Sequence, residues 1–350
     1  MTIGEFSRAV EQDPRSEAAD KSILFENGYQ TSRGLGYVVN GDFARAVDAA
    51  IALGRPLLVA GEPGCGKTEL GHAIARHLQI PRLHLYSVKS TSDANELFYA
   101  YDAIKRFRES QGGVGGAEVG DYVEFQALGR AILDAHERDR IAHLLRGAHA
   151  DYRATNDPGP ARSVVVIDEI DKASADFAND LLHEIEGLRF RVKEFPAMNG
   201  PDGLKREPET PPGDAIAPEH RPIVLITSNE ERQLPDAFLR RCVFLDVPFP
   251  DKKTLKTIVE NGLINRLRRM LGRDAAARHR LDPARRDALV DFFLRFRGVG
   301  PQKAPGIAEL LDAAALAAIA PDKPLEAVAP AIVKTRPDGK KAADAAATMR

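Results

Sequence analysis

One short segment of the sequence has the composition of a loop that binds a phosphate chain. Residues 61–68 match the pattern Gly-x-x-x-x-Gly-Lys-Ser/Thr, in which glycines let several backbone N–H groups face one anion. Lys67 would contact the β- and γ-phosphates of a nucleotide, and the Thr68 hydroxyl would bind Mg²⁺. The candidate binding residues are Gly61, Glu62, Pro63, Gly64, Cys65, Gly66, Lys67, Thr68 and the following Glu69.

The flanking sequence supports this interpretation of the loop. Pro56–Ala60 is a short apolar run, typical of a buried strand, and Glu69–Leu78 has helical periodicity. A helix in this position directs its electropositive N-terminus at the anion. The alternative is a glycine-rich turn before a surface helix, and the strand–loop–helix context argues against it.

A second buried strand, Ser163–Ile167, ends in two adjacent carboxylates, Asp168 and Glu169. Ligands of parallel sheets lie at the carboxyl ends of the strands, so we expect both residues beside the phosphate loop. Asp168 could hold Mg²⁺, and Glu169 could polarise a water for attack on the γ-phosphate. An ordinary strand end with a charged cap is the alternative for this pair taken alone.

Two further groups of polar residues lie near strand ends. The apolar run at 223–226 leads into Thr227, Ser228 and Asn229, and the Asn229 amide could contact the γ-phosphate or orient the water. A simple strand-end turn is the alternative there. Arg240 and Arg241 precede the last strand, where one of them could reach a nucleotide on a neighbouring subunit. Two solvated surface arginines are the alternative.

The order of elements predicts an α/β fold with a mostly parallel, three-layer sheet, followed by a small helical domain. Pro248 and Pro250 mark the change, because no strand pattern follows them. The other expected strands are 82–88 and 241–247, and the expected helices are 41–53, 121–146, 174–185, 255–271, 284–296, 306–320 and 325–333.

The composition limits which cellular compartment and which classes of binding partner are expected. The 350 residues have a formal net charge of −2, which gives no global attraction for nucleic acid or anionic lipid. The two cysteines, Cys65 and Cys242, have no metal-binding spacing and suit a reducing cytosol. Cys65 is interpreted as a small residue of a tight loop rather than as a redox site. No apolar run is long enough to span a membrane, and residues 1–15 do not resemble a signal peptide, so a cytoplasmic protein without a membrane partner is expected.

Several nucleotide-binding and metal-binding classes lack their motifs here. Asn-Lys-x-Asp, which guanine recognition needs, and Leu-Ser-Gly-Gly-Gln, which transporter ATPases carry, are both absent from the sequence. The segment that begins His183-Glu184 starts like a zinc-protease motif but has no second histidine. Metal chemistry of that kind is therefore not expected.

Taken in order, these residues resemble an AAA+ ATPase, and more narrowly its MoxR branch. The approach to the loop (54–64), the segment Phe-Tyr-Ala-Tyr-Asp-Ala at 98–103 and the exit Pro-Phe-Pro-Asp at 248–251 are similar to that branch. The resemblance implies ATP and Mg²⁺ as cofactors and ATP hydrolysis in a homo-oligomeric, usually hexameric, ring. It also implies remodelling of a protein client, often together with a von Willebrand factor A-domain partner.

The resemblance also implies roles for single residues. Lys67 and Thr68 would belong to Walker A, Asp168 and Glu169 to Walker B, and Asn229 would be sensor 1. Arg241 is the better match for an arginine finger, with Arg240 as the alternate. Lys303 is the nearest basic residue to the sensor-2 position, where many relatives have arginine. Tyr37 and Val38 would pack on adenine, or are plain core residues.

The resemblance divides the chain into an N-terminal extension (1–34), an α/β core (35–250), a helical lid (251–335) and a flexible tail (336–350). Residues 89–120 are similar to a helix-2 insertion, and 188–222 to a hairpin enlarged by a long loop. Phe98, Tyr99 and Tyr101 are candidate client contacts, or core residues.

The interpretation is therefore a MoxR-like ATPase that remodels a partner protein. Two alternatives stay open. One is a clamp loader or other nucleic-acid-associated AAA+ motor, against which the near-neutral charge argues. The other is a binding scaffold gated by slow ATP hydrolysis, against which the intact Glu169 argues.

Overall fold

The computed structural model describes residues 23–24, 30–31, 37–39, 41–111, 118–152, 159–199 and 204–347. These residues fall into two compact units. The first unit contains the described residues of Met1–Thr31, Gly41–Ala60 and Ile74–Leu245, and the second contains those of Ser32–Asn40, Gly61–Ala73 and Asp246–Arg350.

Some expectations from the sequence fall outside the described residues. Most of the proposed extension (1–34) does so, except for the short antiparallel pair β1 (Ile23–Leu24) and β2 (Gln30–Thr31). The same holds for residues 112–117 of the first expected insertion, 200–203 of the second and 348–350 of the tail.

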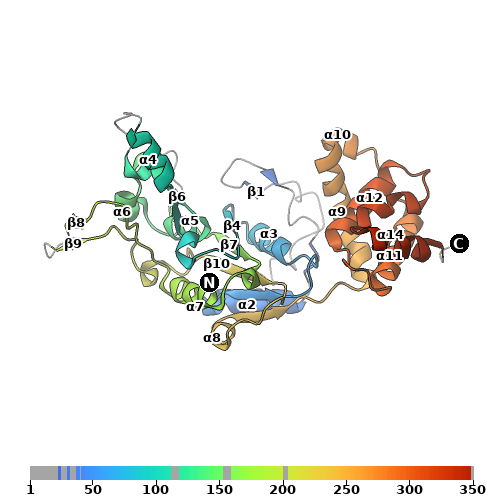
Figure 1. Ribbon diagram of the computed structural model, residues 1–350, viewed down its shortest axis with the longest axis horizontal. Coiled ribbons are helices and arrows are strands. Elements are labelled where there is room, and N and C mark those ends of the chain that lie inside the picture. Colours follow the sequence, from blue (N-terminus) through green and yellow to red (C-terminus); the bar gives the residue numbers. More distant parts are fainter. Residues whose placement is uncertain are drawn as a thin grey trace. The chain divides into compact units, whose positions relative to one another are not determined.

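A parallel sheet forms the centre of the first unit (Figure 1). Its described strands follow the order β11, β3, β10, β7, β4, with β10 parallel to both β3 and β7, and β7 parallel to β4. Neighbours that are not consecutive in the chain need crossover connections, which helices supply. The strands are β3 (Leu57–Ala60), β4 (Leu83–Ser87), β7 (Val164–Asp168), β10 (Ile223–Ser228) and β11 (Val243–Asp246).

Both faces of this sheet are covered. Every residue of β3 and β10 is buried, which explains the continuous apolar runs in the sequence. Helix α2 contacts β3, while α5 contacts β4 and β7. The main helices of this part of the chain are α2 (Gly41–Leu53), α3 (Lys67–His77), α4 (Ala103–Gln111), α5 (Ala127–Asp134), α6 (Arg138–Ile141), α7 (Ala175–Gly187) and α8 (Asp236–Leu239).

The register aligns the carboxyl ends of the central strands. Ser228 of β10 lies opposite Ala60 of β3, and Ile226 lies opposite Ile167 of β7. The next residue of β10, Thr227, therefore lies beside Asp168. The sheet thus gathers the polar residues that end β7 and β10 at the edge where β3 also ends.

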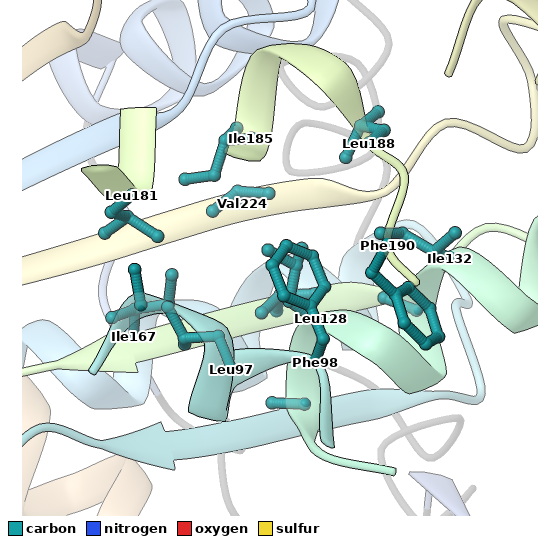
Figure 2. Close-up of a cluster of buried hydrophobic side chains, with 14 of the residues drawn as sticks. Leu97, Phe98, Leu128, Ile132, Ile167, Leu181, Ile185, Leu188, Phe190 and Val224 are labelled. Carbon is teal, nitrogen blue, oxygen red and sulfur yellow. The ribbon is translucent and has the colours of Figure 1, made fainter. Parts of the chain in front are cut away.

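Phe98 belongs to the core that covers one face of the sheet (Figure 2). Its side chain is 2% exposed and stacks on Phe190, with ring centroids 5.3 Å apart. The backbone of Phe98 also contacts α5 closely, because a Cβ added to Gly129 would lie 2.0 Å from the Phe98 carbonyl oxygen. Phe98 is therefore a packing residue, so of its two interpretations, client contact or core residue, the structure supports the core residue.

The two neighbouring tyrosines are only partly buried. The Tyr99 hydroxyl accepts a hydrogen bond from the Lys193 backbone N–H at 3.3 Å, and the Tyr101 hydroxyl accepts one from Arg106 at 2.6 Å. The more exposed apolar side chains of this region are Ile104 and Phe107 of α4, at 64% and 65% exposure.

The segment expected as one helix over 121–146 is broken into short elements. A strand, β6 (Val123–Phe125), pairs antiparallel with β5 (Tyr99–Tyr101), and α5 begins only at Ala127. The alternation of buried Val123 and Phe125 with exposed Glu124 fits a strand, and pairing with β5 outweighs the helical propensity. The remaining turns here are the 3₁₀ helices η2 (Ala94–Leu97), η3 (Val119–Tyr122), η4 (Ala142–Leu144) and η5 (Gly147–His149).

The segment after α7 returns along itself. Arg191 forms a β-bridge with Glu209, and β8 (Met198–Asn199) pairs antiparallel with β9 (Lys205–Arg206). Thr210 joins the two ends of this segment, since its backbone N–H donates to the Phe190 carbonyl and its hydroxyl accepts from the Phe190 N–H. The segment 188–222, expected as a hairpin enlarged by a long loop, thus contains a paired arm followed by η7 (Gly213–Ala215).

In the described residues, every helix or strand that follows β11 is a helix. Their core is formed by aromatic and aliphatic side chains of α9, α11 and α12, including the fully buried Phe293 and Phe296. No helix in the described parts of the chain has the length and apolar character needed to cross a membrane. The elements are α9 (Lys252–Leu271), α10 (Arg273–Ala276), α11 (Pro283–Gly298), α12 (Ile307–Ile319), η8 (Leu325–Val328), α13 (Ala329–Ile332) and α14 (Arg336–Ala347).

Helix α14 differs from the expected flexible tail. Thr335 precedes it and accepts the Asp338 backbone N–H, while the Asp338 carboxylate accepts from the Thr335 hydroxyl and from the backbone N–H groups of Gln302 and Lys303. These hydrogen bonds lower the pKa of Asp338, with the Thr335 contact as the main cause. The pattern Thr-x-Pro-Asp is a helix-start signal that the alanine-rich composition obscures.

The position of Phe98 gives a stability prediction. Phe98→Ala leaves a cavity in the core and is expected to lower the free energy of unfolding by about 3–5 kcal/mol. Phe107→Ala, at an exposed site of α4, is the matched control and should change it by less than about 0.5 kcal/mol. Urea denaturation measures both, and equal effects would contradict the assignment of Phe98 to the core.

Candidate functional site

The phosphate loop connects the end of β3 to the start of α3. Gly61, Gly64 and Gly66 have φ angles of 148°, 79° and 98°, which favour glycine. Space is also limiting, because a Cβ on Gly61 would lie 2.4 Å from the Val247 carbonyl oxygen, and one on Gly64 would lie 2.8 Å from the Gly306 Cα. Both the backbone conformation and the packing therefore require glycine at positions 61 and 64.

Lys67 is the buried cation of the loop. Its side-chain nitrogen donates to the carbonyl oxygens of Gly61 at 2.7 Å and Glu62 at 2.8 Å. Both acceptors are neutral, so the ammonium keeps its attraction for an anion, and it lies at the electropositive N-terminus of α3. Thr68, the second residue of this helix, is half-buried beside it. The arrangement suits a phosphate chain.

Other predicted residues pack around the same loop. The Tyr37 ring lies against it, 3.3 Å from the position that a Cβ on Gly66 would take. Burial raises the pKa of Tyr37 far above its usual value, with smaller contributions from Cys65 and Glu69. Val38 is half-buried next to Tyr37. Tyr37 thus contacts the loop, and a contact of Tyr37 or Val38 with adenine stays a prediction.

Cys65 is 3% exposed. Burial raises the pKa of its thiol, although nearby Lys67 acts in the opposite direction. Cys242, in the first unit, is also buried, and burial raises its pKa to about 12. A buried thiol with a raised pKa is a poor nucleophile, which favours the interpretation of Cys65 as a small packing residue.

A second group of predicted residues meets at the ends of β7 and β10. The Thr227 hydroxyl donates to the Asp168 carboxylate at 2.6 Å and accepts from the Glu169 backbone N–H at 2.9 Å. One side chain thereby fixes both the orientation of Asp168 and the path of the chain into Glu169. This strand-end cluster lies in the first unit, whereas the phosphate loop lies in the second.

Glu169 has an unusual backbone conformation, with φ 61° and ψ 52°. This left-handed conformation is uncommon for residues other than glycine and occurs often at functional sites. Its carboxylate accepts a hydrogen bond from the Asn229 amide at 3.4 Å and forms an ion pair with Lys172. The side chain is about one-third exposed, so water can reach it.

Two further residues of this cluster, Asp171 and Lys172, were not predicted from the sequence. Asp171 is 2% exposed and accepts from the backbone N–H groups of Asn229 at 3.0 Å and Glu231 at 2.9 Å, which holds the turn after β10. Lys172 pairs with Glu169, and this contact raises the pKa of the lysine. Their positions, two or three residues after Glu169, could have indicated from the sequence that they belong to the same cluster.

The remaining predicted residues, Arg240, Arg241 and Lys303, make other contacts or are exposed. Arg241 forms an exposed ion pair with Glu186 of α7 at 3.1 Å, and Arg240 is exposed beside it. The Lys303 side chain is exposed, and its backbone N–H donates to Asp338 at 3.3 Å. Their roles as arginine finger and sensor 2 stay predictions.

The predicted Mg²⁺ donors fit that ion chemically. A threonine hydroxyl (Thr68) and a carboxylate (Asp168) are hard oxygen ligands of the kind that Mg²⁺ prefers. The described residues contain no group of three or more histidine, cysteine or acidic side chains that could hold a metal. Mg²⁺ does not need one, since it is typically held by one or two protein ligands together with waters and substrate phosphates.

The family match identifies the class of protein. The model of the ATPase family associated with various cellular activities (AAA) matches residues 57–248 of the 350. The chain belongs to this family, and its fold is the α/β AAA+ core with a parallel sheet, followed by a helical region. Members of this class are nucleotide-binding P-loop ATPases in general.

Solved structures with detectable similarity include RuvB and FIGL-1. One point mutant of RuvB from Thermotoga maritima is 17% identical with a TM-score of 0.38, over 83% of this chain and 66% of that chain. A second point mutant of the same protein is 17% identical with a TM-score of 0.38, over 82% and 64%. The AAA domain of FIGL-1 in complex with ADP is 16% identical with a TM-score of 0.35, over 85% and 72%.

This chain spans just under two thirds of the length of the two RuvB mutant structures. No curated protein matches the sequence. The assignment to the AAA family therefore rests on the family match and on the residues described above.

The position of Thr227 predicts a specific loss of activity. Thr227→Val keeps the shape of the side chain but removes both hydrogen bonds, so Asp168 and Glu169 lose their common support. We expect kcat for ATP hydrolysis to fall about tenfold or more, with little change in ATP affinity. Steady-state kinetics measure both values. Thr257→Val, which removes an exposed hydroxyl from α9, is the control, and an unchanged kcat in Thr227→Val would contradict the role of Thr227.

Proposed function

We propose that this chain binds ATP with Mg²⁺ and hydrolyses it to ADP and phosphate. The observation that carries the proposal is the Thr227 hydroxyl, which supports Asp168 and Glu169 together at the ends of β7 and β10, the second of which is adjacent to β3. A structural role alone does not explain why a positive-φ carboxylate, a second carboxylate and an amide meet at this edge. The phosphate loop of the same chain would bind the nucleotide on which these residues act.

Each residue has a distinct task in this proposal. The loop N–H groups and Lys67 bind the β- and γ-phosphates, while Lys67 exchanges at least one of its carbonyl partners for phosphate oxygen. Thr68 and Asp168 hold Mg²⁺, which neutralises charge on the phosphates when bound. Glu169 accepts a proton from the attacking water, and Asn229, already bonded to Glu169, orients that water.

The ion pair between Glu169 and Lys172 affects the same step. The Glu169 carboxylate cannot contact the attacking water while it faces Lys172, so its side chain must turn from Lys172 toward the water. Both side chains are at least one-third exposed, and exposed pairs of this kind contribute little stability. The rearrangement therefore needs little free energy.

We further propose that the active form is a homo-oligomeric ring, with six subunits as the expected number. Arg241, or Arg240 as the alternate, would contact the nucleotide of a neighbouring subunit. The Arg241–Glu186 pair is more than half exposed on both sides, so release of the arginine costs little. The ring would remodel a protein client in the cytoplasm, in the manner of the MoxR branch, with a von Willebrand factor A-domain protein as the expected partner.

A variant that binds ATP without hydrolysing it tests the proposed hydrolysis and can also identify the partner protein. Glu169→Gln removes the base but keeps the shape of the side chain, so we expect normal ATP binding and almost no turnover. Lys67→Ala is the control and should lose ATP binding. Full turnover in Glu169→Gln, or wild-type ATP affinity in Lys67→Ala, would contradict the proposed roles.

The same Glu169→Gln protein, loaded with ATP, should retain its partner during affinity purification. Mass spectrometry then identifies the bound proteins. A von Willebrand factor A-domain protein that is absent from the Lys67→Ala sample supports the MoxR-like proposal. A polymerase clamp or DNA would instead favour the nucleic-acid-associated alternative.

Arg241 tests the ring. Arg241→Ala is expected to lower turnover about 10³-fold while ATP binding is largely kept, because the arginine would act only on transition-state charge. Mixing it with Lys67→Ala subunits should restore part of the activity, since each variant supplies what the other lacks. Turnover that no mixing ratio restores would contradict an arginine supplied by a neighbouring subunit, and Arg240→Ala in the same assay decides between the two residues.

A further inference from the structure

Arg297, in the last turn of α11, contacts the phosphate loop directly. Its side chain is 13% exposed, and one guanidinium nitrogen donates to the Glu62 carboxylate at 2.5 Å. A second nitrogen donates to the Pro305 carbonyl oxygen, in the segment that leads into α12. The guanidinium therefore joins three parts of the second unit: α11, the loop, and the start of α12.

The Arg297 guanidinium is also held by an aromatic platform. Its carbon lies 3.5 Å from the centre of the Phe249 ring, a cation–π contact. Phe249 in turn stacks on Phe293 of α11, with ring centroids 6.2 Å apart and planes at 23°. The arginine is fixed before any ligand arrives, and its planar fork is suited to this stacked site in a way that lysine is not.

Glu62 links Arg297 to the phosphate-binding lysine. The Glu62 carboxylate accepts from Arg297, whereas its backbone carbonyl accepts from Lys67. A second contact lies close by, since the Ile307 backbone N–H donates to the Gly64 carbonyl at 2.9 Å. The loop is thus attached to α11 by one charged hydrogen bond and to the start of α12 by one backbone hydrogen bond.

Electrostatics give the Arg297–Glu62 pair a task beyond packing. A phosphate chain is a polyanion, and an unpaired carboxylate within its binding loop would repel it. Arg297 offsets that charge and fixes the direction of the Glu62 side chain. The sequence around 301–305 contains lysine rather than arginine, and the Lys303 side chain is exposed. Arg297, by contrast, contacts the loop through Glu62.

We propose that Arg297 is a positioning residue for nucleotide binding, which acts on the loop through Glu62. This inference rests on the proposed ATP binding. Arg297 offsets the negative charge of Glu62 and stabilises the loop conformation that binds the phosphates. It also connects the loop to α11 and to the segment before α12.

A double-mutant cycle between Arg297 and Glu62 tests the proposal. Arg297→Gln leaves the Glu62 charge unpaired, although solvent screens this side chain, which is 59% exposed. It should raise both the Kd for a fluorescent ADP analogue and the KM for ATP about three- to tenfold, with a much smaller effect on kcat. Adding Glu62→Gln removes the unpaired charge, so the double variant should bind more tightly than Arg297→Gln alone. Arg297→Lys should give an intermediate KM.

The control is Arg295→Gln, which changes an exposed arginine on the same helix. Circular dichroism and Tm show whether each variant is folded, and if Arg297→Gln is not, Arg297→Lys with and without Glu62→Gln replaces it. Wild-type affinity in the Arg297 variants, or no recovery in the double variant, would overturn the inference while leaving ATP binding intact. A wild-type protein that binds no ADP analogue would instead contradict the proposed function.

Discussion

The hydrogen bonds of the Thr227 hydroxyl are the interaction on which the candidate catalytic residues depend. The parallel register of β10 and β7 places this hydroxyl beside Asp168, and the same oxygen receives the Glu169 N–H as the chain leaves the strand. Without it, Asp168 loses a hydrogen bond that orients its carboxylate, and the left-handed conformation of Glu169 has less support. The placement of Asn229 depends on the same edge, through Asp171.

The phosphate loop is held by different means. Its path requires glycine at 61 and 64, where neighbouring backbone leaves no room for a side chain, and its buried lysine is supported by carbonyl groups of the loop itself. Around this frame the second unit adds Tyr37, Arg297 and Ile307. The loop is therefore both the proposed phosphate site and a point of attachment for helices α11 and α12.

The sequence predicted what is local or set by strand order. The loop, the apolar strands and the polar residues that end them follow from short patterns, because parallel strands align their carboxyl ends. It failed where distant contacts decide. Residues 123–125 form a strand because Tyr99–Tyr101 pairs with them, Phe98 is buried because Phe190 and α5 pack on it, and Arg297 meets a partner 235 positions away. The start of α14 is an exception, because the local pattern Thr-x-Pro-Asp at 335–338 already indicates a helix there.

The central claim is that Lys67 and Asp168 act on one nucleotide. An experimental structure of the Glu169→Gln protein with ATP and Mg²⁺ tests it most directly. The account predicts phosphates on the N–H groups of residues 61–68, with the Lys67 ammonium on phosphate oxygen and Asp168, still bonded to Thr227, at the metal. A nucleotide bound elsewhere, or bound at the loop with Asp168 and Thr227 remote from it, would contradict the account.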